Sequence, residues 1–386
     1  MTVPVADSAA ADVAWLARVK EEGDTRPMRT ELDNDQLLLT VLNLFKAKEG
    51  EVIAQIIHVG HRLGLFTALD RECQATSQRL AEATGYHERW VREWLFAMSA
   101  QGLIQHEDGT FALTPEARFA LVDEDSPRYS AGVFGPPITQ HEIDRTVEAF
   151  TTGIGMTWGE HGPETCHFQA AMGAGGQRHY LVPVILDSID GMSDRMRAGA
   201  TVIDIGCGAG IAAEVVASAY PNSRVIGMDP SEHAIEAAAA RAQAAGLSNL
   251  EFRTGAFDSL DGLKDEGIAV DLLLTLDVIH DLPRPGAAVR SARSCLADNG
   301  VWMVADIRAA GSLEENRNMP MLPLMYGMSI LYCMSSAMSE PGGAGLGTMG
   351  LTPEVLREMT DAAGFSSFES REFDADMMNR YYELRP

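Results

Sequence analysis

The stretch VIDIGCGAGIAAEVVASAYPNSRVIGMDPS, residues 202–231, decides the fold class of this 386-residue chain. It opens with an apolar, strand-like run, crosses three alternate glycines into a helical segment, and returns to a second apolar strand that ends at Asp229. A strand, a glycine-rich turn, a helix and a second strand form the repeating unit of parallel α/β sheets. Because ligands of such sheets bind at the carboxyl ends of the strands, we expect a binding site at this turn.

Strand and helix patterns continue to alternate after this stretch. The expected strands are 202–205, 224–228, 250–253, 270–276, 301–306, 367–373 and 380–384. The expected helices are 210–219, 231–245, 285–297 and 352–363. The alternation predicts an α/β domain over residues 201–386, with a Rossmann-like, doubly wound sheet.

Each residue type in the glycine turn has a physical reason to be there. Gly206, Gly208 and Gly210 have no Cβ, so the turn can be tight and a ligand can approach the backbone closely. The helix that follows begins with unpaired N–H groups. Asp229 stands 25 residues after Asp204, at the end of the second strand, where a carboxylate can accept both hydroxyls of a ribose. The unit is suited to a nucleoside.

Nicotinamide dinucleotide enzymes also combine three glycines with a later acidic residue, so a dehydrogenase is one alternative. The spacing here is G-x-G-x-G, whereas the dinucleotide pattern is G-x-G-x-x-G. Asp204, two residues before the first glycine, suits a ligand with a cationic amino-acid tail better than a pyrophosphate.

Composition narrows the class of partner. The formal charge of −25 would repel a nucleic-acid backbone, so no nucleic acid is expected. The five cysteines include no C-x-x-C pair, so no metal is expected either. The first twenty residues lack the basic and apolar regions of a secretory signal, and we expect a cytoplasmic protein. Residues 319–338 are uncharged but contain prolines and glycine, which favours a buried lid or interface over a membrane span.

The region before the α/β domain divides into three parts. Residues 1–35 are weakly patterned and predict a tail. Residues 36–130 contain helical patterns, with Ser77 as a candidate helix cap and Gly85 and Gly102 as helix ends, followed by two short strands around Asp108-Gly109. Three helices and a β-hairpin predict a winged helix. Residues 131–200 form a connector with a helix over 177–197, and its histidines lack the spacing of metal ligands.

Winged helices often bind DNA through one helix, here residues 87–101. That helix carries Arg89 and Arg92 but also Glu88 and Glu93, and we expect Trp90, Trp94, Leu95 and Phe96 to pack. The pattern favours dimerisation and a wall of a substrate pocket over DNA binding.

Four segments together resemble successive motifs of the class I S-adenosylmethionine-dependent methyltransferases: VIDIGCGAG, VIGMDPS, FRTGAFDSL and DLLLTLDVIHDLPRP. With the preceding winged helix, the chain resembles small-molecule O-methyltransferases that carry an N-terminal dimerisation domain. The resemblance implies a homodimer with S-adenosylmethionine in the glycine turn, Asp229 on the ribose and Phe257 on the adenine. Pro230, Ala256 and Leu276 flank that site. The family's acidic adenine contact is replaced here by Gly255, and Asp258 is the candidate substitute.

His280 and Asp281 directly follow the fourth strand, at the expected crevice. Histidine is the side chain whose pKa lies nearest neutrality, and the resemblance implies that His280 is the general base and that Asp306 orients it. A second acidic partner of the histidine is missing, because Gly350 stands in its place. Catalysis by proximity alone is therefore an alternative, as is a thiol acceptor, which ionises with less help.

The acceptor pocket is expected to be largely apolar. Residues 312–350 are rich in methionine and glycine, which suits an adaptable lid or a dimer interface. The candidate polar anchors are Trp158, His161, Tyr326, Tyr332 and Arg308. The sequence thus predicts a methyltransferase acting on a small molecule, most simply at a hydroxyl oxygen. A DNA-binding regulator that senses S-adenosylmethionine is the alternative of another class.

Overall fold

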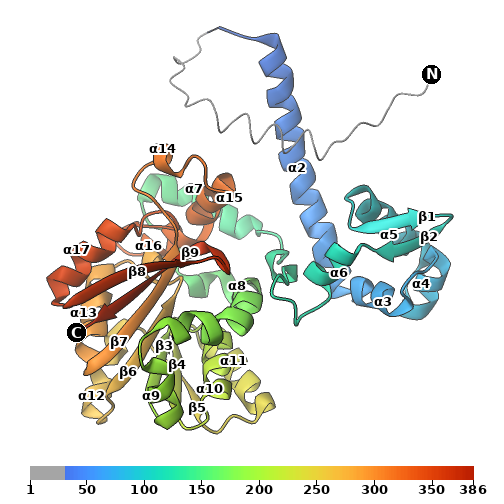
Figure 1. The fold of residues 1–386 in the computed structure, drawn as a ribbon. Helices are drawn as coiled ribbons and strands as arrows, with labels where there is room; N and C mark the ends of the chain where they lie inside the picture. The colour runs from blue at the N-terminus through green and yellow to red at the C-terminus, as the bar shows by residue number, and fades with distance from the viewer. Residues whose placement is uncertain (1–30) are drawn as a thin grey trace.

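The computed structural model describes residues 31–386 as a small helical domain and a larger α/β domain, joined by a connector (Figure 1). Most of the predicted tail, residues 1–30, lies outside the described residues. The first helix, α2 (Asn34–Arg62), begins two residues before the predicted end of the tail, where the side chain of Asp33 accepts hydrogen bonds from two backbone N–H groups. The other domain boundaries stay predictions.

A seven-stranded sheet forms the centre of the larger domain, in the order β5-β4-β3-β6-β7-β9-β8. Its first five strands are parallel, and β9 runs antiparallel to both β7 and β8. The strands are β3 (Thr201–Ile205), β4 (Arg224–Asp229), β5 (Leu250–Thr254), β6 (Val270–Leu276), β7 (Leu296–Ile307), β8 (Ser367–Phe373) and β9 (Asp376–Arg385). This is the predicted doubly wound α/β fold.

The central strands are apolar on both faces because helices cover both sides of the sheet. One core contains residues of β3, β4 and β6 packed under α13 (Pro285–Cys295) and α17 (Pro353–Ala363). The other lies under α9 (Met192–Ala198) and α10 (Ile211–Ala219). In chain order the sheet begins with β3, continues outward through β4 to β5, and then returns to β6 on the other side of β3. The switch point therefore lies between β3 and β6.

The remaining helices of this domain are shorter or lie at its edges. They are α11 (Glu232–Ala245), α12 (Asp261–Asp265), α14 (Leu313–Asn316), α15 (Leu322–Met328) and α16 (Met334–Ala337). A π-helical segment, Ser329–Cys333, joins α15 to α16. The uncharged segment 319–338 is therefore a broken helix that packs on the α/β domain.

The small domain has the predicted winged-helix order. Helices α3 (Leu65–Glu72), α4 (Ser77–Thr84) and α5 (Glu88–Ala100) precede a hairpin of β1 (Ile104–Glu107) and β2 (Thr110–Leu113), and α6 (Pro115–Leu121) follows it. Asp108 and Gly109 both have positive φ, as a tight two-residue turn requires. The prediction of Ser77 as a cap is wrong: Thr76 is the N-cap, and its hydroxyl accepts from the N–H of Arg79.

The contacts of α5 test two predictions, that its aromatic side chains pack and that its arginines are balanced by acidic residues. Trp94 and Leu95 are buried as expected, and the half-exposed ring of Phe96 lies 6.0 Å from the ring of Phe111, whereas Trp90 is 78% exposed. Arg89 pairs with Glu93, and Arg92 lies 3.5 Å from Glu88. Both arginines are thus neutralised along the helix.

The connector contains α7 (Gln140–Thr152), a short 3-10 turn at Trp158–His161, and α8 (Gly162–Gly176). The single helix predicted over 177–197 is wrong. Residues Gln177–Ile185 are π-helical, a 3-10 turn follows at Leu186–Ser188, and α9 begins at Met192. Pro183 lies inside the π-helical part, where it lacks an N–H group for the regular hydrogen-bond ladder.

No single helix within residues 31–386 is long and apolar enough to cross a bilayer. The helices α2 and α3 meet the requirements of length and apolar composition only as a pair, with a bend of 66° between them.

Candidate active site

The glycine turn lies at the carboxyl end of β3, beside the switch point. The backbone N–H of Gly208 donates to Asp229 Oδ2 at 2.9 Å, and the N–H of Ser231 donates to Oδ1 at 2.9 Å. These two bonds fix the Asp229 carboxylate at the end of β4, next to the turn. A carboxylate has further lone pairs, so Asp229 can still accept from the hydroxyls of a ligand.

The three glycines are needed for different reasons. All have positive φ, a conformation that side chains disfavour. A Cβ on Gly206 would lie 2.6 Å from Val278 across the switch point, and one on Gly210 would lie 2.5 Å from Phe252. A Cβ on Gly208 would meet nothing within 4 Å. Gly206 and Gly210 therefore serve packing, whereas Gly208 borders open space.

Asp204 is buried at the end of β3 with an incomplete set of partners. The residue is 2% exposed, and its Oδ2 has no hydrogen-bond partner among the described residues. Burial, with the charge of Asp229 nearby, raises the pKa of Asp204 to about 7. A cation placed beside Oδ2 would repair this unpaired carboxylate.

The residues predicted to surround adenine are only partly free to do so. Phe257 is 7% exposed and belongs to the core beneath α13, so little of its ring is open. Asp258 and Pro230 are exposed, and Ala256 and Leu276 are half-buried. A Cβ on Gly255 would meet Ser259 Oγ at 2.9 Å and Met228 Cε at 3.0 Å, so a side chain there would displace these two side-chain ends. Their roles stay predictions.

His280 and Asp306 form a buried pair where β6 and β7 end. His280 Nδ1 lies 2.7 Å from Asp306 Oδ1, and the two residues are 3% and 0% exposed. Their pairing leaves Nε2 of His280 as the outer ring nitrogen. Gly350 could not supply a further acidic partner, because a Cβ there would lie 2.1 Å from the carbonyl oxygen of Leu346.

Asp281 approaches the other ring nitrogen of His280. Its Oδ1 lies 3.2 Å from His280 Nε2, and its Oδ2 accepts from the indole Nε1 of Trp158 at 2.7 Å. Burial alone would lower the pKa of His280, but the charges of Asp306 and Asp281 outweigh it and hold the pKa well above 6.5. Burial raises the pKa of Asp281 despite the imidazole beside it. The predicted catalytic residues therefore meet in one cluster.

Asp277, which sequence reasoning missed, is the first residue after β6. It has φ +58, an uncommon conformation for a residue with a side chain, and both its carboxylate oxygens accept from Asn379 Nδ2, at 3.0 and 2.9 Å. The residue is open to solvent, yet the surrounding protein desolvates it enough, with the charge of Asp306, to raise its pKa to about 7. The combination is typical of a carboxylate in a deep cleft. Only its place directly after a buried strand signalled it in the sequence.

The connector and the π-helical segment Ser329–Cys333 together supply an aromatic wall next to this cluster. The rings of Trp158 and Tyr332 stack with centroids 5.8 Å apart and planes at 10°, and His161 lies 4.9 Å from Tyr332. His161 Nδ1 is 2.8 Å from Oε1 of Glu142, a second residue that the sequence did not reveal. Burial acts to raise the pKa of Glu142, but hydrogen bonds from His161 and Thr139 lower it overall. Ionised Glu142 thus orients the His161 ring.

Two other predicted acceptor contacts lie elsewhere. Tyr326 lines a cavity of about 240 Å³ with Leu346 and Met349, not the wall formed by Trp158. The guanidinium of Arg308 is bound to the carbonyl oxygens of Phe373, Asp376 and Asn379, so it holds the turn between β8 and β9 rather than a ligand.

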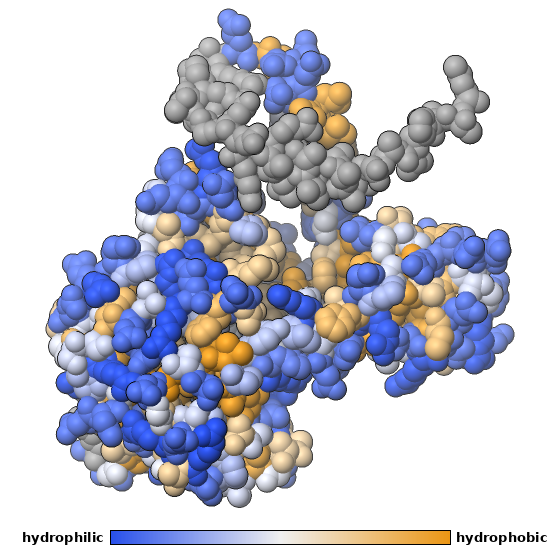
Figure 2. Space-filling view, viewed as in Figure 1, coloured by the Kyte–Doolittle hydropathy of each residue, from blue (hydrophilic) through white to orange (hydrophobic). Residues whose placement is uncertain are grey.

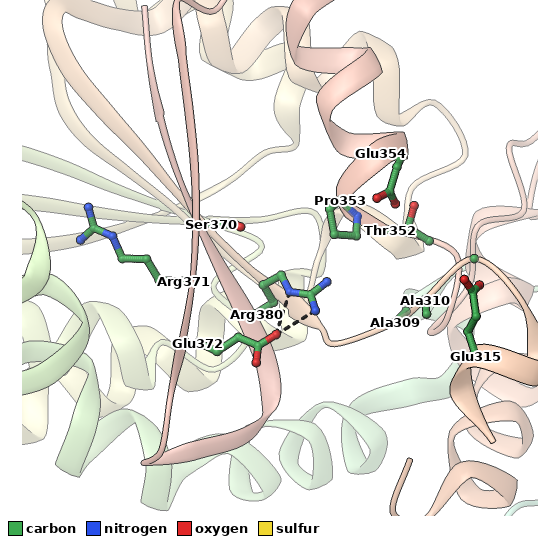
Figure 3. A pocket seen from close by; sticks show the side chains of 11 residues that line it. Ala309, Ala310, Glu315, Thr352, Pro353, Glu354, Ser370, Arg371, Glu372 and Arg380 are labelled. Carbon is green, nitrogen blue, oxygen red and sulfur yellow. Dashed lines mark hydrogen bonds and ion pairs between the residues drawn. The ribbon is translucent and has the colours of Figure 1, made fainter. Parts of the chain in front are cut away.

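A further cavity of about 790 Å³ opens between the start of α17 and the outer strands β8 and β9 (Figure 3). The lining charges are mixed, and Arg380 is paired with Glu372 at 2.8 Å. None of the predicted catalytic or cofactor residues lines it. The groups suited to chemistry lie at the switch point and not in this cavity.

Known sequence families match both domains. Residues 196–339 match a family described as a methyltransferase domain. Residues 51–122 match a family described as an Rv2258c-like winged HTH domain.

Curated relatives include ubiquinone biosynthesis O-methyltransferases. The protein from Ruegeria pomeroyi is 26% identical over 205 residues, covering 50% of this chain and 75% of that protein. The one from a Methylobacterium is 30% identical over 110 residues, covering 28% of this chain and 42% of that protein. This chain thus spans less than half of the second relative.

Solved structures share the fold over nearly the whole chain. An O-methyltransferase family protein from Burkholderia thailandensis has a TM-score of 0.60 at 18% identity, covering 89% of this chain and 98% of that chain. Human N-acetylserotonin methyltransferase, solved in complex with S-adenosylmethionine, has a TM-score of 0.62 at 16% identity, covering 93% and 99%. At these identities the likeness shows the fold.

Proposed function

Because this chain is an S-adenosylmethionine-dependent methyltransferase in which a winged-helix domain precedes the methyltransferase domain, we propose that it methylates a hydroxyl oxygen of a small molecule. We further propose that His280 is the base. The observation that carries this proposal is the buried His280–Asp306 pair, 2.7 Å apart, at the carboxyl ends of the two strands next to the glycine turn.

The residues at the turn fit the methyl donor. S-adenosylmethionine, when bound, supplies a methyl group on a positively charged sulfonium. Asp229 is fixed for ribose, and the unpaired Oδ2 of Asp204 is suited to the ammonium of the amino-acid tail. Gly208 provides the open side of the turn. Carboxylates at the ends of β3, β4, β6 and β7 also favour a cationic ligand over a pyrophosphate.

His280 has the orientation that proton abstraction requires. Asp306 binds Nδ1, so Nε2 of the neutral ring is the atom that takes the proton of the acceptor hydroxyl as its oxygen gains the methyl group. Because Asp306 and Asp281 raise the pKa of His280 well above 6.5, the neutral ring becomes available as the pH rises, and methyl transfer should accelerate with pH. Asp281 Oδ1 lies 3.2 Å from Nε2 and stabilises the imidazolium that results.

Trp158, Tyr332 and His161 would form the wall against which the acceptor lies. Their rings are fixed by mutual stacking, by Asp281 and by Glu142, so the wall is rigid before any ligand binds. A rigid wall lowers the entropy cost of placing an acceptor in near-attack geometry.

The decisive experiment uses S-adenosylmethionine with an isotopically labelled methyl group and a panel of phenols, alcohols, thiols and amines. Label recovered on oxygen in wild type, and lost in His280→Gln while S-adenosylhomocysteine still binds, supports the proposal. Label on sulfur or nitrogen alone would contradict it. His233→Gln, on the exposed side of α11, is the matched control.

We also infer that the chain forms a homodimer through α2. Every described residue from 31 to 52 is exposed in one copy, and the exposed apolar side chains of α2 include Leu37, Leu38, Leu39, Val41, Leu42, Leu44 and Phe45. Figure 1 shows this half of α2 projecting from the molecule, and Figure 2 shows hydrophobic side chains on the projecting part. Burying a leucine stabilises by about 1.5–3 kcal/mol, so a second copy that covers this helix would gain considerable free energy.

A further inference from the structure

Three side chains of different chemistry converge at the proposed base. A ring nitrogen of His280, a carboxylate oxygen of Asp281 and the Sγ of Cys333 all lie within 4.8 Å of one another. The three residues are buried, with exposures of 3%, 8% and 8%. Cys333 comes from the π-helical segment before α16, far in sequence from the other two.

Outer contacts orient two of these donor atoms inward. Asp306 occupies Nδ1 of His280, and Trp158 occupies Oδ2 of Asp281. Asp281 Oδ1 is buried and lies 3.2 Å from His280 Nε2, and the thiol of Cys333 is close enough to the Asp281 carboxylate to act against the rise of its pKa. A buried carboxylate oxygen aimed at a nitrogen and a sulfur is an incompletely satisfied group.

The donor set is selective for one class of ion. Nitrogen, sulfur and one carboxylate oxygen suit zinc and related transition metals, whereas Mg²⁺ and Ca²⁺ prefer oxygen ligands alone. Zinc sites with three protein ligands keep a fourth position open. Histidine ligands of zinc commonly donate their other N–H to a carboxylate, as His280 can to Asp306.

We propose that His280, Asp281 and Cys333 bind a divalent transition-metal ion of the zinc type, and that the bound ion inhibits methyl transfer. The inhibitory part rests on the proposed function, since the metal takes the Nε2 atom that would receive the acceptor's proton. A dication at this place also repels a sulfonium. Zinc therefore weakens binding of S-adenosylmethionine more than binding of the uncharged thioether S-adenosylhomocysteine.

Cobalt gives a direct spectroscopic test of the site. Full-length protein is stripped with a chelator, dialysed and titrated with Co²⁺ at constant pH. A thiolate-to-cobalt charge-transfer band that saturates at one ion per chain is expected in wild type. Cys333→Ser is expected to lose the band and to bind Zn²⁺ about 10–100-fold more weakly in equilibrium dialysis. Cys73→Ser, which changes an exposed thiol, is expected to keep the charge-transfer band and the wild-type affinity for Zn²⁺.

Different experimental results would refute the metal site, the inhibition and the proposed function. A wild-type protein that binds no metal, or a band that persists in Cys333→Ser with unchanged circular dichroism, overturns the metal site. A metal-loaded protein that binds S-adenosylmethionine and S-adenosylhomocysteine as tightly as the stripped protein overturns the inhibition. If the stripped protein binds neither compound, the proposed function fails, while the cobalt result still decides the site.

Discussion

The indole of Trp158 donates a 2.7 Å hydrogen bond to the carboxylate of Asp281, across 123 residues of sequence. The bond joins the connector to the loop after β6 and fixes the carboxylate next to His280. Trp158 was predicted as an acceptor contact, and the structure gives it a further part in positioning the catalytic cluster. The connector therefore contributes to the proposed active site as well as linking the two domains.

We expect Trp158→Phe to slow methyl transfer about tenfold, because Asp281 Oδ2 would lose its partner in a buried place, at a cost of about 1–3 kcal/mol. Binding of S-adenosylhomocysteine should change little, since among the described residues the Trp158 indole donates to Asp281 and not to the glycine turn. Turnover and calorimetry on the same preparation measure the two effects. Trp90→Phe, at an exposed ring, serves as control, and equal losses in both variants would refute the assignment.

Asp306→Asn tests the orientation of His280. An amide at this place can donate to Nδ1, which moves the ring proton to Nε2 and removes the base. We expect the rate of methyl transfer to fall about 100-fold or more, since general bases contribute about 10²–10⁴. Asp298→Asn, an exposed residue of the same strand, should retain wild-type turnover. Retention of activity in Asp306→Asn would show that proximity alone suffices.

The affinity for S-adenosylmethionine should rise with pH near neutrality. The pKa of Asp204 is raised to about 7 by burial and Asp229, so the group is neutral below that pH and anionic above it. Only the anion attracts the ammonium of the ligand, and from pH 6 to pH 8 we expect about a tenfold gain from this group. Calorimetry at several pH values with Asp204→Asn, in which the dependence should flatten, measures it. The same pH dependence in both proteins would exclude Asp204 as its source.

The raised pKa of Asp204 also makes the stability of the unliganded protein depend on pH, but this stability falls as the pH rises. The folded state holds a proton on Asp204 between about pH 4 and 7 that the unfolded state releases, so the unliganded protein loses stability as pH rises through this window. Thermal melting of the unliganded wild type and of Asp204→Asn across this range should show a steeper decline in the wild type.

Gly206 and Gly208 provide a matched pair for the turn. Gly206→Ala should destabilise the domain, because the Cβ would lie 2.6 Å from Val278 at positive φ; overpacking costs about 1–3 kcal/mol, several degrees in Tm. Gly208→Ala also has positive φ but open space, so a smaller loss of stability and a larger loss of cofactor affinity are expected. Melting curves and calorimetry separate them. If the two variants lost the same stability and the same cofactor affinity, the different roles of Gly206 and Gly208 would be contradicted.

The proposed dimer is tested on α2. Leu42→Asp together with Phe45→Asp places two charges in the exposed apolar part and should yield monomers in light scattering. Lys48→Asp, an exposed change on the same helix, should not. A monomeric wild type would contradict the proposal outright.

Local sequence patterns were enough to predict the sheet and the glycine turn, whereas the family resemblance implied that Asp306 orients His280. Each depends on residues within one strand–turn–helix unit, or on the ends of adjacent strands. Predictions were incomplete where contacts join distant segments, as with Asp277 and Asn379, 102 residues apart, or Cys333 and His280. They were wrong where one proline changed the helix type, at Pro183. Tertiary packing decides such features, and no local periodicity reports it.

The most direct test of the central claim compares wild type and His280→Gln on hydroxyl acceptors of graded acidity. If His280 removes the proton, the loss of rate in the variant should grow as the acceptor becomes less acidic, from a few-fold for acidic phenols to about 10²–10⁴ for alcohols. A loss that is small and independent of acceptor acidity would contradict base catalysis by His280.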